Sequence, residues 1–326
     1  MRGILRPVLL PLLRKDPGMV DKQARQFSVK SEDGQALVAG VGRAFLAGYN
    51  VMLGARRIGD VNAAGRAVEP HFRPFFFEGA AMGYLPRGYF TDGAGKAQVE
   101  ADLLGMDPRF LYLYNVGLGF WFGFRHPGRP ATLEALAPHV DPFYFPLCYD
   151  GYGFKVGFFD FPGRESSLAI LDRAPANRRA EIYQGFGRSL HFVCMEDEDR
   201  FTRAKAGVPS AYRDDVESGR SLAVAFTGIN RPELILRHLA AAADDHALAL
   251  RLLGVTWALT AREMNDSDYF ERCLAALPPG RRHLLRLLAQ RCGEAKERAT
   301  SYAAWRVETR DAVMAVYSAS EEVASR

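Results

Sequence analysis

The fold is decided by the stretch Cys148-Tyr149-Asp150-Gly151-Tyr152-Gly153-Phe154-Lys155-Val156-Gly157-Phe158-Phe159. Aromatic residues flank its glycines, whereas turn glycines usually have Asn, Asp, Ser or Pro beside them. The same combination recurs on both sides, so that Gly117, Gly151 and Gly185 stand 34 residues apart. Further glycines continue a similar spacing outward, namely Gly48, Gly79, Gly219 and Gly254. We interpret the pattern as a degenerate internal repeat of about 34 residues.

A repeat of this length is typical of a pair of short helices with their turns. A small residue at the repeat position lets neighbouring backbones approach closely, and aromatic side chains fill the gaps around it. The alternative is an α+β fold, because residues 110–160 are rich in Tyr, Phe and Gly and resemble strands locally. We favour an all-α array of helix-pair repeats, either a TPR-like solenoid or a curled array, because the later copies show little alternation.

The length of 326 residues exceeds a typical single domain but suits one continuous array. We predict a basic apolar N-terminal arm and polar linker at 1–34, a helical repeat domain at 35–299 and a C-terminal helix or cap at 300–326. Residues 1–15 do not form a signal peptide, because Pro7 and Pro11 break the apolar run. This arm either packs on the first repeat or makes a weak contact with a membrane surface.

The composition excludes several functional classes. The net charge is +4, and the charged residues are scattered along the chain, a pattern that does not predict nucleic-acid binding. The longest uncharged run, Phe110 to Phe124, is shorter than the roughly 20 residues that cross a bilayer. The four cysteines have no paired spacing, which indicates free thiols in a reducing compartment and a cytoplasmic protein.

No motif predicts a cofactor. The glycines after Gly117 and Gly151 miss the dinucleotide fingerprint by one residue and lack its β-α-β context. His191 and Cys194 are three residues apart and could share a metal, but no further ligands follow at a suitable spacing. We therefore predict neither a metal nor a cofactor.

An ordered set of stretches resembles the DUF1702 family over residues 25–280. The stretches are Val41-Gly-Arg-Ala-Phe-Leu-Ala-Gly-Tyr49, Phe76-Phe-Glu-Gly-Ala-Ala-Met-Gly83, Tyr114-Asn-Val-Gly-Leu-Gly119, Asp141-Pro142, Asp150-Gly-Tyr-Gly-Phe154 and Gln184-Gly-Phe-Gly-Arg-Ser-Leu190. This bacterial family of unknown function is known mainly as a conserved protein of enediyne natural-product gene clusters. The resemblance implies work on, or near, the polyketide-derived polyene of the enediyne core, but it implies no catalytic residue.

The residue before the repeat glycine is polar in several copies, which are Glu78, Asp150, Gln184 and Ser218. If the copies stack, these side chains fall on one lining of the array, and concave repeat surfaces commonly bind ligands. Alternatively, each polar group caps or hydrogen-bonds a neighbouring helix. On the functional interpretation, the candidate ligand-lining residues are Tyr114, Asn115, Trp121, Tyr152, Phe154, Gln184 and Ser218.

The candidate catalytic residues are Glu78, Asp150 and Arg188. Two carboxylates that share a desolvated pocket can perform general acid–base chemistry, because one pKa is then raised. Arg188 lies near Gln184 on one helix face, where it would hold an anion or pair with Asp150. The alternative for Arg188 is a purely structural ion pair between repeats.

Two functional hypotheses follow. The first is an enzyme, or an essential enzyme subunit, that acts on an apolar polyene in enediyne-type polyketide biosynthesis. The second is a non-catalytic carrier or scaffold that shields the polyene or assembles other proteins of the same cluster.

Overall fold

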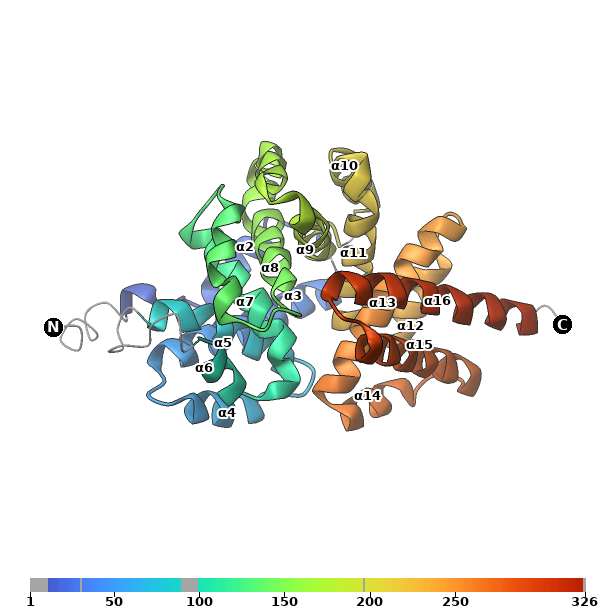
Figure 1. Ribbon diagram of the computed structural model, residues 1–326, viewed down its shortest axis with the longest axis horizontal. Helices are drawn as coiled ribbons and strands as arrows, with labels where there is room; N and C mark the ends of the chain where they lie inside the picture. Colours follow the sequence, from blue (N-terminus) through green and yellow to red (C-terminus); the bar gives the residue numbers. More distant parts are fainter. Residues whose placement is uncertain (1–10, 30, 89–98, 196, 325–326) are drawn as a thin grey trace. The chain divides into compact units, whose positions relative to one another are not determined.

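The structure is a computed structural model that describes residues 11–29, 31–88, 99–195 and 197–324. The chain divides into two compact units, Met1–Pro209 and Ser210–Arg326, here called the first and second units (Figure 1). Within the described ranges every regular element is a helix and no strand occurs. The predicted all-α class is therefore confirmed.

The first unit contains most of the repeat glycines. Its α-helices are α2 (Gly18–Ala24), α3 (Glu32–Gly54), α4 (Ile58–Arg66), α5 (Arg73–Arg87), α6 (Val99–Gly105), α7 (Leu111–Arg125), α8 (Pro146–Lys155), α9 (Arg179–Val193) and α10 (Glu198–Ala206). The connections on either side of α7–α9 include the 3-10 helices η2 (Pro108–Phe110), η3 (Pro130–His139), η5 (Phe161–Gly163), η6 (Glu165–Arg173) and η7 (Ala176–Arg178). A π-helical turn, η4 (Val156–Asp160), continues α8. Around α8, 3-10 turns therefore stand where supporting α-helices were expected.

The second unit is also helical. Its elements are η8 (Ser210–Tyr212), α11 (Arg213–Gly228), α12 (Pro232–Ala240), α13 (Asp245–Asn265), α14 (Ser267–Leu274), α15 (Pro279–Arg298) and α16 (Tyr302–Ala324). The side chains of Asp244 and Asp266 cap α13 and α14 by accepting from backbone amides. Such caps satisfy amides that have no partner inside the helix.

The repeat glycines mark direct contacts between helix backbones. A Cβ atom on Gly117, Gly151, Gly185 or Gly254 would lie about 2 Å from a carbonyl oxygen of the preceding glycine-bearing helix, where no side chain fits. That carbonyl belongs to the residue immediately before the preceding repeat glycine. The distances are 2.3 Å from Gly117 to Glu78, 1.9 Å from Gly151 to Val116, 1.8 Å from Gly185 to Asp150 and 2.1 Å from Gly254 to Ser218.

The second glycine of a repeat makes the matching contact on the other side. A Cβ on Gly119 would lie 1.8 Å from the carbonyl of Cys148, and one on Gly153 would lie 1.9 Å from that of Ile182. Helices α7, α8 and α9 are therefore in backbone contact in chain order, as their neighbouring green ribbons show (Figure 1). The strand alternative for residues 110–160 is wrong, because their glycines serve close helix packing rather than a pleated sheet.

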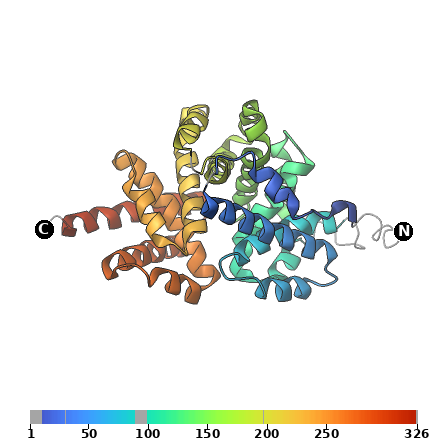
Figure 2. The same ribbon diagram turned by 180° about the vertical axis from the view of Figure 1, so that it is seen from behind.

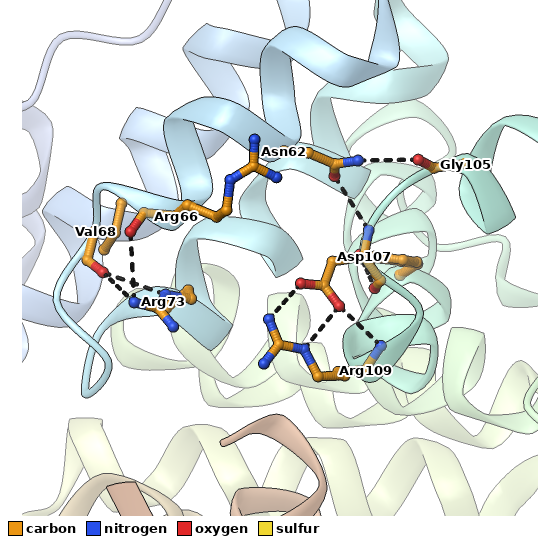
Figure 3. Close-up of polar contacts among 8 residues, drawn as sticks. Asn62, Arg66, Val68, Arg73, Gly105, Asp107 and Arg109 are labelled. Atoms are coloured by element: carbon orange, nitrogen blue, oxygen red, sulfur yellow. Dashed lines mark hydrogen bonds and ion pairs between the residues drawn. The ribbon is translucent and has the colours of Figure 1, made fainter. Parts of the chain in front are cut away.

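Polar contacts fix the segments that lead into α5 and α7 (Figure 3). Asn62 of α4 donates to the carbonyl of Gly105 (3.0 Å) and accepts from the amide of Asp107 (3.1 Å). Asp107 forms an ion pair with Arg109 (2.6 Å) and accepts from its amide. Arg73 donates to carbonyl oxygens at the α4–α5 turn. These contacts hold the starts of the two helices that lie beside each other in the core.

Helix α3 has the length and apolar composition of a membrane span, and among the described residues it is the one helix that does. It packs along α5 through two glycines. A Cβ on Gly48 would lie 1.8 Å from the carbonyl of Phe76, and one on Gly79 would lie 1.9 Å from that of Phe45.

The observed division of the chain differs from the predicted one. The range predicted as a single repeat domain, 35–299, is split between the two units, and the tail from residue 300 forms α16 of the second unit. Residues 1–10 of the predicted N-terminal arm lie outside the described residues. The rest of the arm and linker is not a plain loop, because it contains α2 and because Leu13 packs on a core cluster of the first unit.

Replacing Gly151 by alanine should destabilise the protein by about 2–3 kcal/mol, because the new methyl group overlaps the Val116 carbonyl and the two helices must separate. The measurement is chemical denaturation of both proteins. Gly59→Ala is the control, because a Cβ at Gly59 of α4 meets nothing within 4 Å. Equal stability of Gly151→Ala and the parent protein would contradict the backbone contact.

Candidate functional site

The first unit contains a partly open apolar cavity of about 410 Å³. This volume lies in the range of small-molecule sites, about 300–1,000 Å³. Helices α2, α3, α5, α7, α8 and α9 and the π-helical turn η4 all contribute to its walls. Every aromatic residue of the lining is a phenylalanine, and these are Phe45, Phe75, Phe120, Phe124, Phe154, Phe158, Phe159 and Phe192. Apolar side chains therefore make up most of the cavity wall, and its polar residues are Lys15, Lys22, Gln23, Gln26, Glu78 and Arg188.

Many residues of the cavity walls stand at fixed sequence distances from the repeat glycines. Three residues after Gly79, Gly117, Gly151 and Gly185 stand Met82, Phe120, Phe154 and Arg188, and all four line the cavity. Seven residues after the last three glycines stand Phe124, Phe158 and Phe192, which also line it. Residues three to four apart share one helix face, so the close helix contacts align these faces into one surface.

The phenylalanine rings form a continuous apolar path. The ring centroids are 5.1 Å apart for Phe45 and Phe120 and 5.7 Å apart for Phe120 and Phe154. Phe154 and Phe158 stack at 5.4 Å with 18° between their planes. Rings at such distances and tilts attract one another beyond simple burial. A flat, elongated hydrocarbon suits a path of this kind.

Helix α2 and its flanks form the N-terminal wall of the cavity. The residues that face the cavity from this segment are Lys15, Met19, Val20, Lys22, Gln23 and Gln26. The view from behind shows the segment, in dark blue, in front of the green helices of the first unit (Figure 2). The side chain of Gln23 donates to the carbonyl of Phe158 (2.9 Å) and joins this wall to η4.

The polar part of the cavity is a cluster of Glu78, Asp150 and Arg188, which come from α5, α8 and α9. The Arg188 guanidinium donates to the Asp150 carboxylate and lies 3.7 Å from the Glu78 carboxylate. Gln184, one turn before Arg188, donates to the other Asp150 oxygen at 3.4 Å. Glu78, Asp150 and Gln184 are each at most 4% exposed. Glu78 and Arg188 line the cavity directly, whereas Asp150 lies behind Arg188.

Burial raises the pKa of Glu78 from its ordinary value of 4.5 to about 7. Arg188 opposes the shift and Asp150 adds to it. Burial alone would lower the pKa of Arg188, but the charges of Asp150 and Glu78 more than compensate and raise it. At neutral pH, Glu78 is therefore populated in both its protonated and its ionised form beside the Arg188–Asp150 ion pair. This is the property that a general acid–base residue needs.

Of the predicted lining residues of the first unit, Phe154 lines the cavity, whereas Gln184 is buried against Asp150 and the others hold the structure. Tyr114 donates its hydroxyl to the carbonyl of Asp107 (2.6 Å), and Tyr152 donates to that of His126 (2.8 Å). Asn115 is buried and donates to a carbonyl one turn earlier in α7. Trp121 packs beside the cluster of Tyr49, Leu53, Met82 and Phe120.

The offset of three residues leads to a hydrophobic cluster in the second unit. Ser218 donates its hydroxyl to the carbonyl of Asp214, one turn earlier in α11. Leu222 and Trp257 stand three residues after Gly219 and Gly254, and both pack into a cluster with Trp305 of α16. The Trp257 and Trp305 rings are 6.2 Å apart. In the second unit, the residues at this offset pack against Trp305, whereas in the first unit they line the cavity.

Sequence reasoning missed most of the cavity wall. It selected the column immediately before the repeat glycines, which contains Glu78, and it named Phe154 and Arg188 without recognising the columns three and seven residues after the glycines. The signal was present, because Phe120, Phe154 and Arg188 stand at a constant offset from glycines 34 residues apart. The contribution of α2 had no signal in the repeat. Among the described residues, no group of three or more His, Cys, Asp or Glu is arranged to hold a metal.

Glu78→Gln should change the pH dependence of stability. Glu78 binds its proton more tightly when folded, so the ionised carboxylate destabilises the native state progressively as pH rises from 4.5 to about 7. At pH 5, Glu78 is protonated and resembles glutamine, so the two proteins should be similarly stable. At pH 8 the variant should be more stable by up to about 3 kcal/mol.

Urea denaturation of both proteins at the two pH values measures this difference. Glu233→Gln is the control, because Glu233 is an exposed carboxyl of α12 in the second unit. A stability difference between parent and Glu78→Gln that is the same at pH 5 and pH 8 would contradict the raised pKa.

The comparisons with known proteins identify a family. The profile of the family described as "Protein of unknown function (DUF1702)" matches residues 4–313, nearly the whole chain. No curated protein and no solved structure matches the chain. The backbone contacts at the repeat glycines and the cavity they build are therefore features of a chain that belongs to the DUF1702 family.

Proposed function

We propose that the first unit binds an elongated, conjugated hydrocarbon chain in its cavity and moves a proton on it through Glu78. The observation that carries the proposal is the carboxyl of Glu78, with its raised pKa, in a cavity whose lining contains eight phenylalanines and, among the described residues, no other carboxyl. An apolar cavity of this kind favours a ligand without hydrogen-bonding groups along its length. The phenyl faces suit a flat conjugated chain, because stacked π systems attract one another.

The chemistry follows from the charges around Glu78. In its protonated form, Glu78 donates a proton to one carbon of the chain, and a π electron pair forms the new C–H bond. The resulting cation is delocalised along the chain and is stabilised by the faces of nearby rings such as Phe120 and Phe154. The Glu78 carboxylate then removes a proton from another carbon. The double bonds have shifted, the composition is unchanged and no oxidant or reductant is consumed.

Arg188 and Asp150 have a supporting role in this scheme. Asp150 neutralises Arg188, so that Arg188 does not hold Glu78 permanently ionised. Arg188 in turn lies over the Phe154 ring, with the guanidinium carbon 5.3 Å from the ring centroid. These contacts fix the guanidinium beside Glu78. Asp150→Asn should therefore impair turnover by making Arg188 a stronger partner for Glu78.

The family resemblance suggests the biological occupant of the cavity. On the proposal, it is the polyketide-derived polyene of enediyne antibiotic biosynthesis, and the protein is an enzyme or an essential enzyme subunit of that secondary metabolism. Other proteins of the same biosynthetic cluster supply and remove the polyene. A cytoplasmic location agrees with the free cysteines, of which Cys148, Cys194 and Cys292 are buried.

The experiment uses methyl parinarate, a neutral conjugated tetraene whose absorption and fluorescence report binding. The protein is incubated with it in D₂O, and the recovered tetraene is analysed by mass spectrometry. Proton transfer through Glu78 should introduce deuterium into the chain. Glu78→Gln should still bind the tetraene, but it should introduce deuterium about a hundredfold more slowly, because the acid–base group is missing.

Val41→Trp provides the control for the place of binding. Val41 of α3 lines the cavity, so the larger side chain should abolish binding. Ala47→Trp is the matched substitution on the exposed side of α3 and should bind normally. Binding without deuterium incorporation would contradict the catalytic role and support a non-catalytic carrier. Binding that Val41→Trp leaves unchanged would contradict the site itself.

A further inference from the structure

The lysines of the cavity come from one segment only. Lys15 and Lys22 both belong to the N-terminal wall, and the remaining basic residue of the lining, Arg188, comes from α9. Lys15 is half-buried and Lys22 is exposed. One wall of a cavity made almost entirely of hydrocarbon thus carries two ammonium groups.

The position of Lys15 is held by its backbone and not by its charge. Its amide donates to the Asn50 side chain (3.0 Å), and its carbonyl accepts from the same side chain (2.8 Å). Within the described residues, neither Lys15 nor Lys22 has an ion-pair partner. The neighbouring Asp16 accepts from the amide of Gly18 (2.9 Å), and neither Asp16 nor Asp21 lines the cavity.

The N-terminal wall and the cluster of Glu78, Asp150 and Arg188 present different charges to a ligand. The cluster of Glu78, Asp150 and Arg188 carries one negative charge when Glu78 is ionised and none when it is protonated. It therefore offers no net attraction to an anion, and its carboxylates repel one at short range. The lysine-bearing wall attracts an anion inside the cavity, because Lys15 and Lys22 line it and the neighbouring Asp16 and Asp21 do not. An amphiphile with a negative head group consequently has one favourable orientation in this cavity.

We propose that the ligand of the cavity is a conjugated chain that ends in a carboxylate, and that Lys15 and Lys22 hold this carboxylate. The inference rests on the proposed function, because it assigns the head group of the same ligand. The carboxylate lies against the N-terminal wall, and the hydrocarbon chain continues over the phenylalanine rings toward Glu78. The lysines thereby decide which part of the chain reaches the acid–base group.

Parinaric acid and its methyl ester separate the head group from the chain, because they share one tetraene. Fluorescence titration of the parent protein should show the acid binding about tenfold more tightly than the ester at low salt. The preference should shrink at high salt, because partly exposed charges are screened. Lys15→Met with Lys22→Met should bind the two forms about equally, since methionine retains the apolar stem of lysine without its charge.

Lys22→Met alone tests the same point in a protein whose folding is not at risk, because Lys22 is exposed. It should lose part of the preference for the acid. Arg25→Met is the matched control, since Arg25 is an exposed cation of the same segment that does not line the cavity. It should keep the full preference.

The outcomes distinguish this inference from the proposed function. Equal binding of acid and ester by the parent protein would overturn the carboxylate assignment and leave the apolar ligand in place. A preference for the acid that survives both lysine substitutions would overturn the role of the lysines. Failure of both tetraenes to bind would overturn the proposed function together with this inference.

Discussion

The contact between a glycine and a carbonyl of the neighbouring helix is the constraint on which the rest of the structure depends. A Cβ atom at Gly117, Gly151 or Gly185 would lie between 1.8 and 2.3 Å from such a carbonyl. For each of these three glycines, the partner carbonyl belongs to the residue just before the repeat glycine of the previous helix. Each contact therefore fixes both the distance between the two helices and their relative position along the helix axis. Side chains at equal offsets from the glycine are thereby aligned across α5, α7, α8 and α9, and this alignment produces the phenylalanine surface.

The two units use this surface differently. In the second unit, Trp305 of α16 packs onto Trp257, and the two rings form part of a hydrophobic core cluster. In the first unit, the N-terminal wall covers the surface without filling it, and α2 has no buried residue of its own. The cost of keeping Glu78 and Arg188 away from water is considerable, because desolvation of buried charges opposes their attraction. Retaining such groups beside an empty apolar volume favours a role in ligand chemistry over one in stability.

The spacing of the glycines was enough to predict the helical class. Close helix packing requires glycine at the contact positions, and these positions can be read directly from the sequence. It also led to Glu78, Asp150 and Arg188, which the structure places together. The lysines of the N-terminal wall were beyond prediction, since only the path of residues 11–29 across the first unit brings them to the cavity. The roles of Tyr114 and Tyr152 were equally hidden. Each phenol is bound to a backbone carbonyl in a connecting segment, and repeat spacing carries no information about those segments.

The most direct test of the account is an infrared difference titration of the carboxyl groups, recorded with and without methyl parinarate. The account predicts one carboxyl that titrates near pH 7, disappears in Glu78→Gln and shifts to higher pH when the tetraene displaces water from the cavity. Persistence of the same signal in Glu78→Gln, or a midpoint that the tetraene leaves unchanged, would contradict the claim that Glu78 is the proton-transferring group of a ligand-binding cavity.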